Sequence, residues 1–338
     1  MKKLFSYPAS LSGASVAVVL LACSWLRTTL PTPDAAPPVH QEVIGPTATL
    51  SLSPIPQSAS PPTETLQPSP TFTPGGAVRF AVIGDYGSGN EDARQVAELV
   101  KSWKPDFILT TGDNNYPDGA RETIDHRIGQ FYHEYIYPYR GRYGKGADRN
   151  RFFPTLGNHD WMSENAQPYL DYFELPNNER YYDFSWGAGH FFALDSDSNE
   201  PDGVGRSSRQ AQWLQERLAA STQPWQIVFM HHPPYTSGKR GAVEWMRWPF
   251  KEWGVEAVLC GHDHFYERLL VDGLVYFING AGGGGLYDFG PIAEGSQKRF
   301  NGAYGAMLVT MDHQQVVFEF FAVGGVLIDQ HVLTQPVP

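Results

Sequence analysis

Residues 78–85 read VRFAVIGD, and this stretch decides the fold. A short apolar run rich in β-branched and aromatic residues is typical of a strand buried on both faces. The same arrangement, an apolar run followed directly by polar residues of ligand type, recurs at residues 107–116, 227–233 and 257–264. In open α/β sheets, ligands gather just past the carboxyl ends of such strands. The sequence therefore predicts an α/β fold with its chemistry in loops along one rim of a sheet.

Five clusters of polar residues carry this chemistry, at residues 84–87, 112–116, 157–160, 231–233 and 261–264. The third cluster follows a run that Pro154 interrupts, and a proline is found in sheets mainly on edge strands. A single Gly-Asp is more often a strand-ending turn, and a single His-x-His is more often part of a loop or core. The five clusters together, four of them directly after strand-like runs, indicate one crevice.

The clusters resemble those of the calcineurin-like metallophosphoesterases, and among these the small, tartrate-resistant-like purple acid phosphatases. The distinguishing residue is Tyr116, three positions after Asp113. The resemblance covers roughly residues 78–322. It implies a four-layer α-β-β-α metallophosphoesterase sandwich of two mixed sheets.

The resemblance also implies a binuclear metal centre with seven ligands. Asp113 would bridge the ions, and the others would be Asp85, Tyr116 and His264 at the first site, and Asn158, His231 and His262 at the second. Two ions clamp the phosphoryl oxygens and lower the pKa of a bound water, which supplies the attacking hydroxide. Hard phenolate and carboxylate ligands favour Fe(III) at the Tyr116 site, whereas imidazole and amide ligands favour Fe(II), Zn or Mn at the second.

Further residues of the clusters are expected to act on the substrate. The resemblance implies that His159 faces the phosphate and either protonates the leaving group or stabilises its charge, with a structural role as the alternative. Asp160 either orients His159 or forms a turn or helix cap. The His-x-Pro spacing of the family favours His231 as the metal ligand, which leaves His232 beside the substrate.

One departure from the family lies after the fourth cluster, where many purple phosphatases have a further histidine and this chain has Lys239 and Arg240. Arginine cannot act as a general acid, but it can bind phosphate through two hydrogen bonds. Arg240 is therefore expected to bind the substrate, and a solvated surface pair is the alternative. Asp263 is expected to be a hydrogen-bonded spacer and Cys260 a buried thiol.

Residues 1–23 have the features of a signal peptide, with Lys2 and Lys3 before an apolar core at 15–22. The core ends in Leu-Leu-Ala-Cys, which resembles a bacterial lipobox, so Cys23 is the expected site of lipidation. One alternative is an uncleaved anchor, although the core is shorter than the ~20 residues of a spanning helix. The other is a cleaved, secreted product.

Residues 24–76 are expected to be a disordered tether. The 46 residues from 31 to 76 hold 12 Pro and 12 Ser or Thr but no Lys or Arg, and such a segment cannot bury enough apolar surface to fold. Residues 77–338 remain as the catalytic domain. The predicted location is the cell envelope or surface, with the domain tethered to the membrane.

Several elements follow from local patterns. Helices are expected at 91–104 and at 207–220, with Ser207 as an N-cap. Strands are expected at 274–278, 305–311, 316–323 and 326–333. The aromatic run 131–139 is expected to pack in the core or loops, and the glycine-rich run 279–285 to form a flexible turn rather than a phosphate loop.

The net charge and the cysteine content limit the functions and the disulfide bonds that this chain can have. The net charge of −11 argues against nonspecific nucleic-acid binding, and two cysteines permit no internal disulfide once Cys23 is modified. The chain is predicted to be an exported binuclear-metal phosphatase that acts on small phosphate monoesters. The alternatives are a phosphodiesterase or nucleotide phosphatase on the same site, and a noncatalytic surface binding module.

Overall fold

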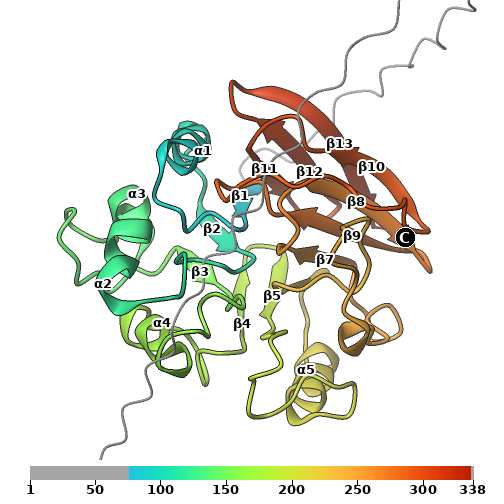
Figure 1. Cartoon of the computed structure of the whole chain (residues 1–338). Coiled ribbons are helices and arrows are strands. Elements are labelled where there is room, and N and C mark those ends of the chain that lie inside the picture. The colour runs from blue at the N-terminus through green and yellow to red at the C-terminus, as the bar shows by residue number, and fades with distance from the viewer. Residues whose placement is uncertain (1–75, 336–338) are drawn as a thin grey trace, which may run out of the picture. The chain divides into compact units, whose positions relative to one another are not determined.

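Two β-sheets form the centre of the protein in the computed structural model, which describes residues 76–335 (Figure 1). The six-stranded sheet has the order β13-β12-β11-β1-β2-β3. Its strands are β1 (Val78–Ile83), β2 (Phe107–Thr110), β3 (Phe152–Pro154), β11 (Gly305–Met311), β12 (Gln315–Ala322) and β13 (Val326–Thr334). The seven-stranded sheet has the order β10-β8-β9-β7-β6-β5-β4. Its strands are β4 (Tyr182–Trp186), β5 (Gly189–Ala193), β6 (Trp225–Phe229), β7 (Ala257–Cys260), β8 (Tyr266–Val271), β9 (Leu274–Asn279) and β10 (Ser296–Phe300).

Both sheets are mixed, as predicted. In the first, β1, β2 and β3 run parallel, while β11, β12 and β13 add antiparallel pairs. In the second, β5, β6, β7 and β9 run parallel, and β4, β8 and β10 add antiparallel pairs. The parallel strands of each sheet end at a common edge, and this places the polar clusters that follow them close together.

The sheets pack face to face through aromatic side chains. Phe80 of β1 meets Phe191 of β5 with ring centroids 5.2 Å apart, and Phe277 of β9 stacks on Phe318 of β12 at 4.6 Å. The next residue of β5, Phe192, points the other way and packs with residues of the helix α5 (Arg209–Ala219). This alternation gives each sheet one face toward its partner and one toward helices, which confirms the four-layer sandwich.

Helices cover the outer faces of the sheets. The α-helices are α1 (Glu91–Ser102), α2 (Arg121–Ile124), α3 (Gln130–Tyr132), α4 (Gln167–Tyr172) and α5 (Arg209–Ala219). A π-helix, η1 (Asp125–Gly129), joins α2 to α3, and short 3₁₀ turns are η2 (His133–Tyr135), η3 (Glu164–Ala166) and η4 (Glu244–Met246). The N-cap of α5 is Ser208, whose side chain accepts the backbone N–H of Ala211. The prediction of Ser207 was therefore wrong by one residue.

Several sequence predictions about packing are confirmed. Cys260 is buried and unpaired, and Phe131, Tyr132 and Tyr135 of the aromatic run lie in the core. Pro154 belongs to β3, which pairs only with β2 at the edge of its sheet, so its missing N–H disrupts no ladder.

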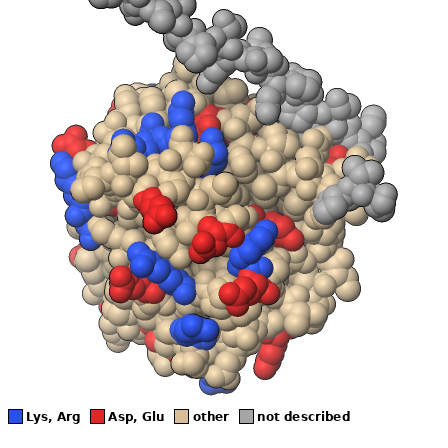
Figure 2. Space-filling view, turned by 90° about the vertical axis from the view of Figure 1, so that its right-hand side faces the viewer, with Lys and Arg blue, Asp and Glu red and all other residues tan. Residues whose placement is uncertain are grey.

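The predicted signal peptide, Cys23 and most of the tether lie outside the described residues. Between residues 76 and 335, none of the helices has the length and apolar content that crossing a bilayer requires. Figure 2 shows one face of the protein, on which basic and acidic side chains are interspersed. That face therefore presents a mixed charge pattern.

Candidate metal centre

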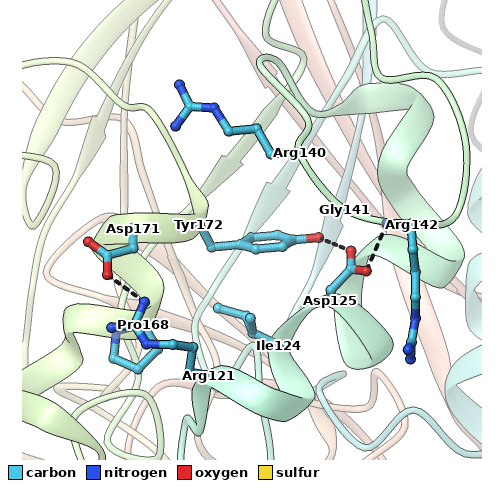
Figure 3. Close-up of a pocket in the computed structure, with 9 residues that line it drawn as sticks. All are labelled: Arg121, Ile124, Asp125, Arg140, Gly141, Arg142, Pro168, Asp171 and Tyr172. Carbon is cyan, nitrogen blue, oxygen red and sulfur yellow. Dashed lines mark hydrogen bonds and ion pairs between the residues drawn. The ribbon is translucent and has the colours of Figure 1, made fainter.

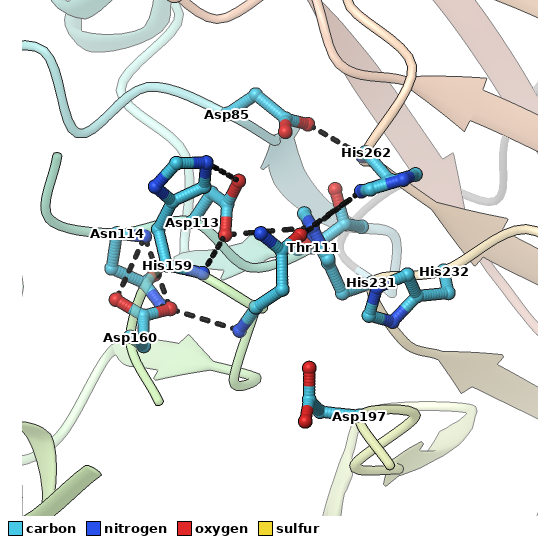
Figure 4. Close-up of polar contacts among 12 residues, drawn as sticks. Asp85, Thr111, Asp113, Asn114, His159, Asp160, Asp197, His231, His232 and His262 are labelled. Carbon is cyan, nitrogen blue, oxygen red and sulfur yellow. Dashed lines mark hydrogen bonds and ion pairs between the residues drawn. The ribbon is translucent and has the colours of Figure 1, made fainter. Parts of the chain in front are cut away.

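The polar clusters converge where the two sheets meet, as Figure 4 shows for residues of both. Asp85 follows β1 and Asp113 follows β2, whereas His231 and His262 follow β6 and β7 of the other sheet. Asp85, Asp113 and His231 are almost completely buried. The structure brings the seven predicted ligands into two groups that share Asp113.

The first group surrounds the phenolic oxygen of Tyr116. This oxygen lies 3.0 Å from Oδ2 of Asp113, 3.2 Å from Oδ1 of Asp85 and 3.0 Å from Nε2 of His264. Nδ1–H of His264 donates to the carbonyl of Gly285 at 2.7 Å, so the lone pair of Nε2 faces the oxygens. A ring held in this way by a backbone carbonyl is typical of metal-binding histidine.

The second group surrounds the amide oxygen of Asn158. This oxygen lies 3.1 Å from Nε2 of His231 and 3.1 Å from Nδ1 of His262, and the two nitrogens are 3.2 Å apart. Nδ1–H of His231 donates to the carbonyl of Thr111 at 2.8 Å, which again leaves the inner nitrogen free to bind a metal.

Asp113 lies between the two groups, with one oxygen toward each. Its Oδ2 faces Tyr116, and its Oδ1 lies 3.5 Å from Nε2 of His231. Oδ1 also accepts the backbone N–H of His159 at 2.9 Å, which fixes the carboxylate. This is the placement that a bridging ligand needs.

The electrostatics of the centre favour cations. Burial alone would lower the pKa values of His231 and His264, but the carboxylates Asp113 and Asp85 raise both above the usual value. Burial, with Asp85 and Asp113, also raises the pKa of Tyr116 well above its ordinary range. A metal ion would offset this negative charge and favour the phenolate form of Tyr116. The donor set therefore fits two metal ions.

The backbone of the loops is strained at the candidate ligands. Asp85, Asp113 and His262 have φ values of 55°, 51° and 69°, in the left-handed region that costs non-glycine residues about 1–3 kcal/mol each. Gly112 has φ 90°, and a Cβ there would lie 2.6 Å from Nδ1 of His231. Such strain is typical of functional loops, because it is retained only where the surroundings enforce it.

His159 lies at the partly exposed edge of the centre, whereas its neighbour Asp160 is buried. The His159 ring packs against Tyr116, its Nε2 lies 3.9 Å from Oδ2 of Asp113, and its Nδ1 contacts the carbonyl of Pro117. Asp160 is buried and accepts the backbone N–H groups of Asn114 and Gly157 at 2.9–3.2 Å. These contacts favour the alternative prediction, in which Asp160 has a turn role. Its carboxylate links the loop at residues 157–160 to the loop at residues 112–116.

His232 lies beside the second group, but its contacts differ from those of His231. Its Nδ1 lies 3.0 Å from the hydroxyl of Ser196, and its ring centroid is 4.6 Å from that of His262. Burial, followed by the charge of His231, lowers the pKa of His232 well below its usual value. Ser196 was not predicted from the sequence, although it follows the apolar run of β5 as the other clusters follow theirs.

Arg240 and Lys239 line a cavity of about 400 Å³ with Asp263, Leu286, Tyr287 and Asp288. The guanidinium of Arg240 lies 4.7 Å from the ring centroid of Tyr287 and donates to its hydroxyl at 2.9 Å. Tyr287 in turn stacks on the ring of His264 at 4.0 Å. Arg240 is thus connected to the first group through Tyr287, whereas Lys239 pairs with the exposed Asp288 at 3.1 Å. Tyr287 had no signal in the sequence.

The glycine-rich run is part of the wall of the centre, so the prediction of a flexible turn was wrong. The backbone N–H of Gly282 donates to the carbonyl of Gly84, and that of Gly284 donates to the carbonyl of Asp85 at 2.8 Å. A Cβ at Gly284 would lie 2.7 Å from Cε1 of His264. Gly282 and Gly284 have no room for a side chain, because the run packs directly against the loop that carries Asp85. Asp263 is confirmed as a spacer, because its carboxylate accepts the hydroxyl of Thr236 at 2.6 Å.

A second cavity, of about 430 Å³, lies beside α2 and α4 (Figure 3). It is lined by Arg121, Ile124, Asp125, Arg140, Gly141, Arg142, Pro168, Asp171 and Tyr172. Its three arginines are matched by the two lining carboxylates and by Glu164 and Glu174, which pair with Arg121 and Arg140. The charges of this cavity are already compensated, and none of the seven candidate ligands lines it.

Comparisons with known proteins agree with this geometry. A family model described as calcineurin-like phosphoesterase matches residues 78–266. Tartrate-resistant acid phosphatase type 5 of Rattus norvegicus is 27% identical over 248 residues, which cover 62% of this chain and 73% of that protein. Purple acid phosphatase PPD1 from yellow lupin (Lupinus luteus) superimposes with a TM-score of 0.62 at 18% identity, over 76% of this chain and 54% of its own. GAP50, described as the anchor in the inner membrane complex of Plasmodium, superimposes with a TM-score of 0.60 at 19% identity, over 77% of this chain and 90% of its own.

Proposed function

This chain belongs to the calcineurin-like phosphoesterase family, and we propose that it is an exported phosphatase that hydrolyses phosphate monoesters. As a member of this family it is a metal-dependent phosphoric ester hydrolase. The observation that carries the proposal is the position of Asp113, with one carboxylate oxygen toward Tyr116 and the other toward His231. This carboxylate can hold two ions close enough to share one phosphoryl group.

The ligand types suggest which ions are bound. Asp85, Asp113, Tyr116 and His264 would hold Fe(III), because carboxylate and phenolate are hard donors. Asn158, His231 and His262, with Asp113, would hold Fe(II), Zn or Mn. When bound, the two ions would neutralise the charge of the phosphoryl oxygens and lower the pKa of a bound water.

His159 is the candidate proton donor to the leaving group. A carbonyl oxygen only accepts hydrogen bonds, so the contact with Pro117 places a proton on Nδ1 of His159. Its Nε2 lies on the side of Asp113, at the partly exposed mouth of the centre. When the ring is protonated, Nε2–H can donate to a leaving oxygen there.

Arg240 is the candidate for recognising substrate charge outside the reacting phosphoryl group. Its guanidinium is held over Tyr287 by one hydrogen bond, and its remaining N–H groups can reach a carboxylate or phosphate in the cavity. Because Arg240 is solvent-exposed, its contribution is to orient the substrate rather than to drive binding.

The noncatalytic alternative is disfavoured by the completeness of the site. GAP50 is described as an anchor, and it has the same fold. In the present chain, however, all seven candidate ligands lie together, in two adjoining groups that share Asp113. Buried carboxylates and histidines in this arrangement would be costly without a cation.

Export and anchoring through Cys23 rest on the first 76 residues of the sequence. Expression of the full chain in a bacterial host, with Cys23→Ser as the matched variant, tests this location. We expect the wild-type chain in the membrane fraction, released only by detergent, and the variant to lose this behaviour. Recovery of both proteins in the same soluble fraction would contradict lipid anchoring.

Substrate preference is tested with matched aryl phosphate monoester and diester, using residues 77–338 loaded with metal. We expect a higher kcat/KM for the monoester. A higher value for the diester would shift the assignment to a phosphodiesterase on the same site. Absence of turnover of both esters by the fully loaded protein would favour the binding module.

A further inference from the structure

We propose that Ser196 fixes His232 as a hydrogen-bond donor to the phosphoryl group, which makes Ser196 a positioning residue of the reaction. The inference rests on the proposed function. It assigns a role to a serine that lies outside the five metal-binding clusters, and it decides whether His232 binds substrate or metal.

The hydrogen bonds of Ser196 determine which nitrogen of His232 carries the proton. The Ser196 hydroxyl oxygen accepts the backbone N–H of His232 at 2.8 Å and lies 3.0 Å from its Nδ1. Ser196 is fully buried, and Nδ1 is the one acceptor that contacts its hydroxyl within residues 76–335. If Nδ1–H donated instead, the hydroxyl hydrogen would be buried without a partner, which is costly. The hydroxyl therefore donates to Nδ1, and the neutral ring carries its proton on Nε2.

An Nε2–H group at this position suits a phosphoryl oxygen and not a metal ion. The His232 ring lies 4.9 Å from the His231 ring and 4.6 Å from the His262 ring, measured between centroids (Figure 4). One ring nitrogen lies within 4.8 Å of the ligand atoms of both histidines. A protonated nitrogen has no lone pair for a metal. It can donate to an oxygen of a phosphoryl group held at the second metal.

The loop that carries Ser196 is fixed from several sides. Thr155 donates to the carbonyl of Leu194 at 2.6 Å, and the indole N–H of Trp245 donates to the carbonyl of Ser196 at 3.2 Å. The carboxylate of Asp195 accepts the indole N–H of Trp161 at 3.0 Å. Because these contacts hold the backbone on both sides, the hydroxyl is oriented before substrate binds, as a positioning group must be.

The test compares Ser196→Ala with wild type in the zinc-loaded full chain, with binding of inorganic phosphate as the main readout. We expect the Kd for phosphate and the KM for an aryl phosphate monoester to rise about tenfold, as for loss of one hydrogen bond to a charged group. Metal content should stay at the wild-type value. Ser196→Thr keeps the hydroxyl and should restore phosphate affinity. The double variant Ser196→Ala/His232→Ala should bind phosphate no more weakly than His232→Ala alone.

A matched control is available at Ser221, which contacts His190 of β5. The hydroxyl of Ser221 lies 2.9 Å from Nδ1 of His190, so Ser221→Ala removes a serine–histidine contact of the same kind outside the metal centre. It should leave phosphate affinity unchanged. A loss of affinity shared by both alanine variants would show a general structural effect and would overturn the proposal.

The tautomer is measured directly by nitrogen-15 NMR of histidine in the zinc-loaded wild-type protein, with His232→Ala for assignment. We expect the proton of His232 on Nε2. A proton on Nδ1, or loss of zinc from Ser196→Ala, would make His232 a metal ligand and overturn the proposal, as would unchanged phosphate affinity in a folded Ser196→Ala. If wild type hydrolyses no ester, the proposed function fails, while the NMR result still decides the tautomer.

Discussion

Asp113 is the residue on which both metal positions depend, because each of its carboxylate oxygens faces a different group of ligands. Asp113→Asn removes the negative charge and keeps the shape of the side chain. We expect metal content to fall below two ions per chain and kcat/KM to fall by on the order of 10²–10³. Metal analysis and kinetics check this, with the exposed Asp171→Asn as control. Full metal content in Asp113→Asn would contradict the bridging role.

His159 is expected to act on the leaving group rather than on the metals. His159→Ala should retain its metals, while kcat for an alkyl phosphate falls by on the order of 10²–10⁴, as for loss of a general acid. The loss should be smaller for a nitrophenyl phosphate, because that leaving group needs no proton. Equal losses for both substrates, or loss of metal, would assign His159 a structural role.

The candidate ligands can be identified in the sequence, but the residues that support the ligand side chains cannot. Asp85, Tyr116 and His264 could be proposed as ligands because they lie in short motifs that resemble those of the family, and such motifs are visible in the local sequence. Ser196 and Tyr287 could not, because their roles arise from contacts with residues 36 and 23 positions away in the chain. For the same reason the contact of Asp160 with Asn114, which lies 46 residues away in the chain, could not be anticipated.

At the level of elements, most strands with continuous apolar runs were predicted, with β5 as an exception, and polar strands were not. β1, β7 and β11 have the predicted bounds. β10 reads SQKRF and is partly exposed at a sheet edge, where pairing on one side does not require apolar side chains. β8 contains Glu267, whose buried carboxyl group accepts hydrogen bonds from Ser237 and Ser296. This acidic residue interrupts the apolar pattern from which a strand is predicted.

The glycine-rich loop after β9 gives a prediction with a control at the adjacent residue. Gly284→Ala would place a Cβ 2.7 Å from the His264 ring, whereas a Cβ at Gly285 meets nothing within 4 Å. We expect Gly284→Ala to weaken metal binding at the first site and to lower kcat/KM at least tenfold, as when the support of a metal ligand is disturbed. Gly285→Ala should behave as wild type. Equal metal affinity in both variants would contradict direct packing against the ligand.

The stability of the whole molecule should depend on Glu256, which lies outside the metal centre. Burial raises the pKa of this carboxyl to about 7 from an ordinary value of 4.5. The folded state therefore holds a proton that the unfolded chain releases, so this group lowers stability as pH rises from about 4.5 to about 7. Glu256→Gln can still accept the N–H of Gln226 and should remove this loss.

Melting temperature as a function of pH checks this prediction. We expect Glu256→Gln and wild type to melt at similar temperatures near pH 4.5, and the variant to melt higher above pH 7. A difference between them that is independent of pH would show that Glu256 has the same pKa in the folded and unfolded chain.

In the whole molecule, the two sheets bring their loops together around the proposed site of two metal ions. The most direct measurement is the metal dependence of phosphate-monoester hydrolysis by residues 77–338, titrated from the metal-free protein. We predict that two ions bind per chain and that hydrolysis appears as the second ion binds. Hydrolysis that persists without metal, or that reaches its full rate with one ion per chain, would contradict the binuclear centre.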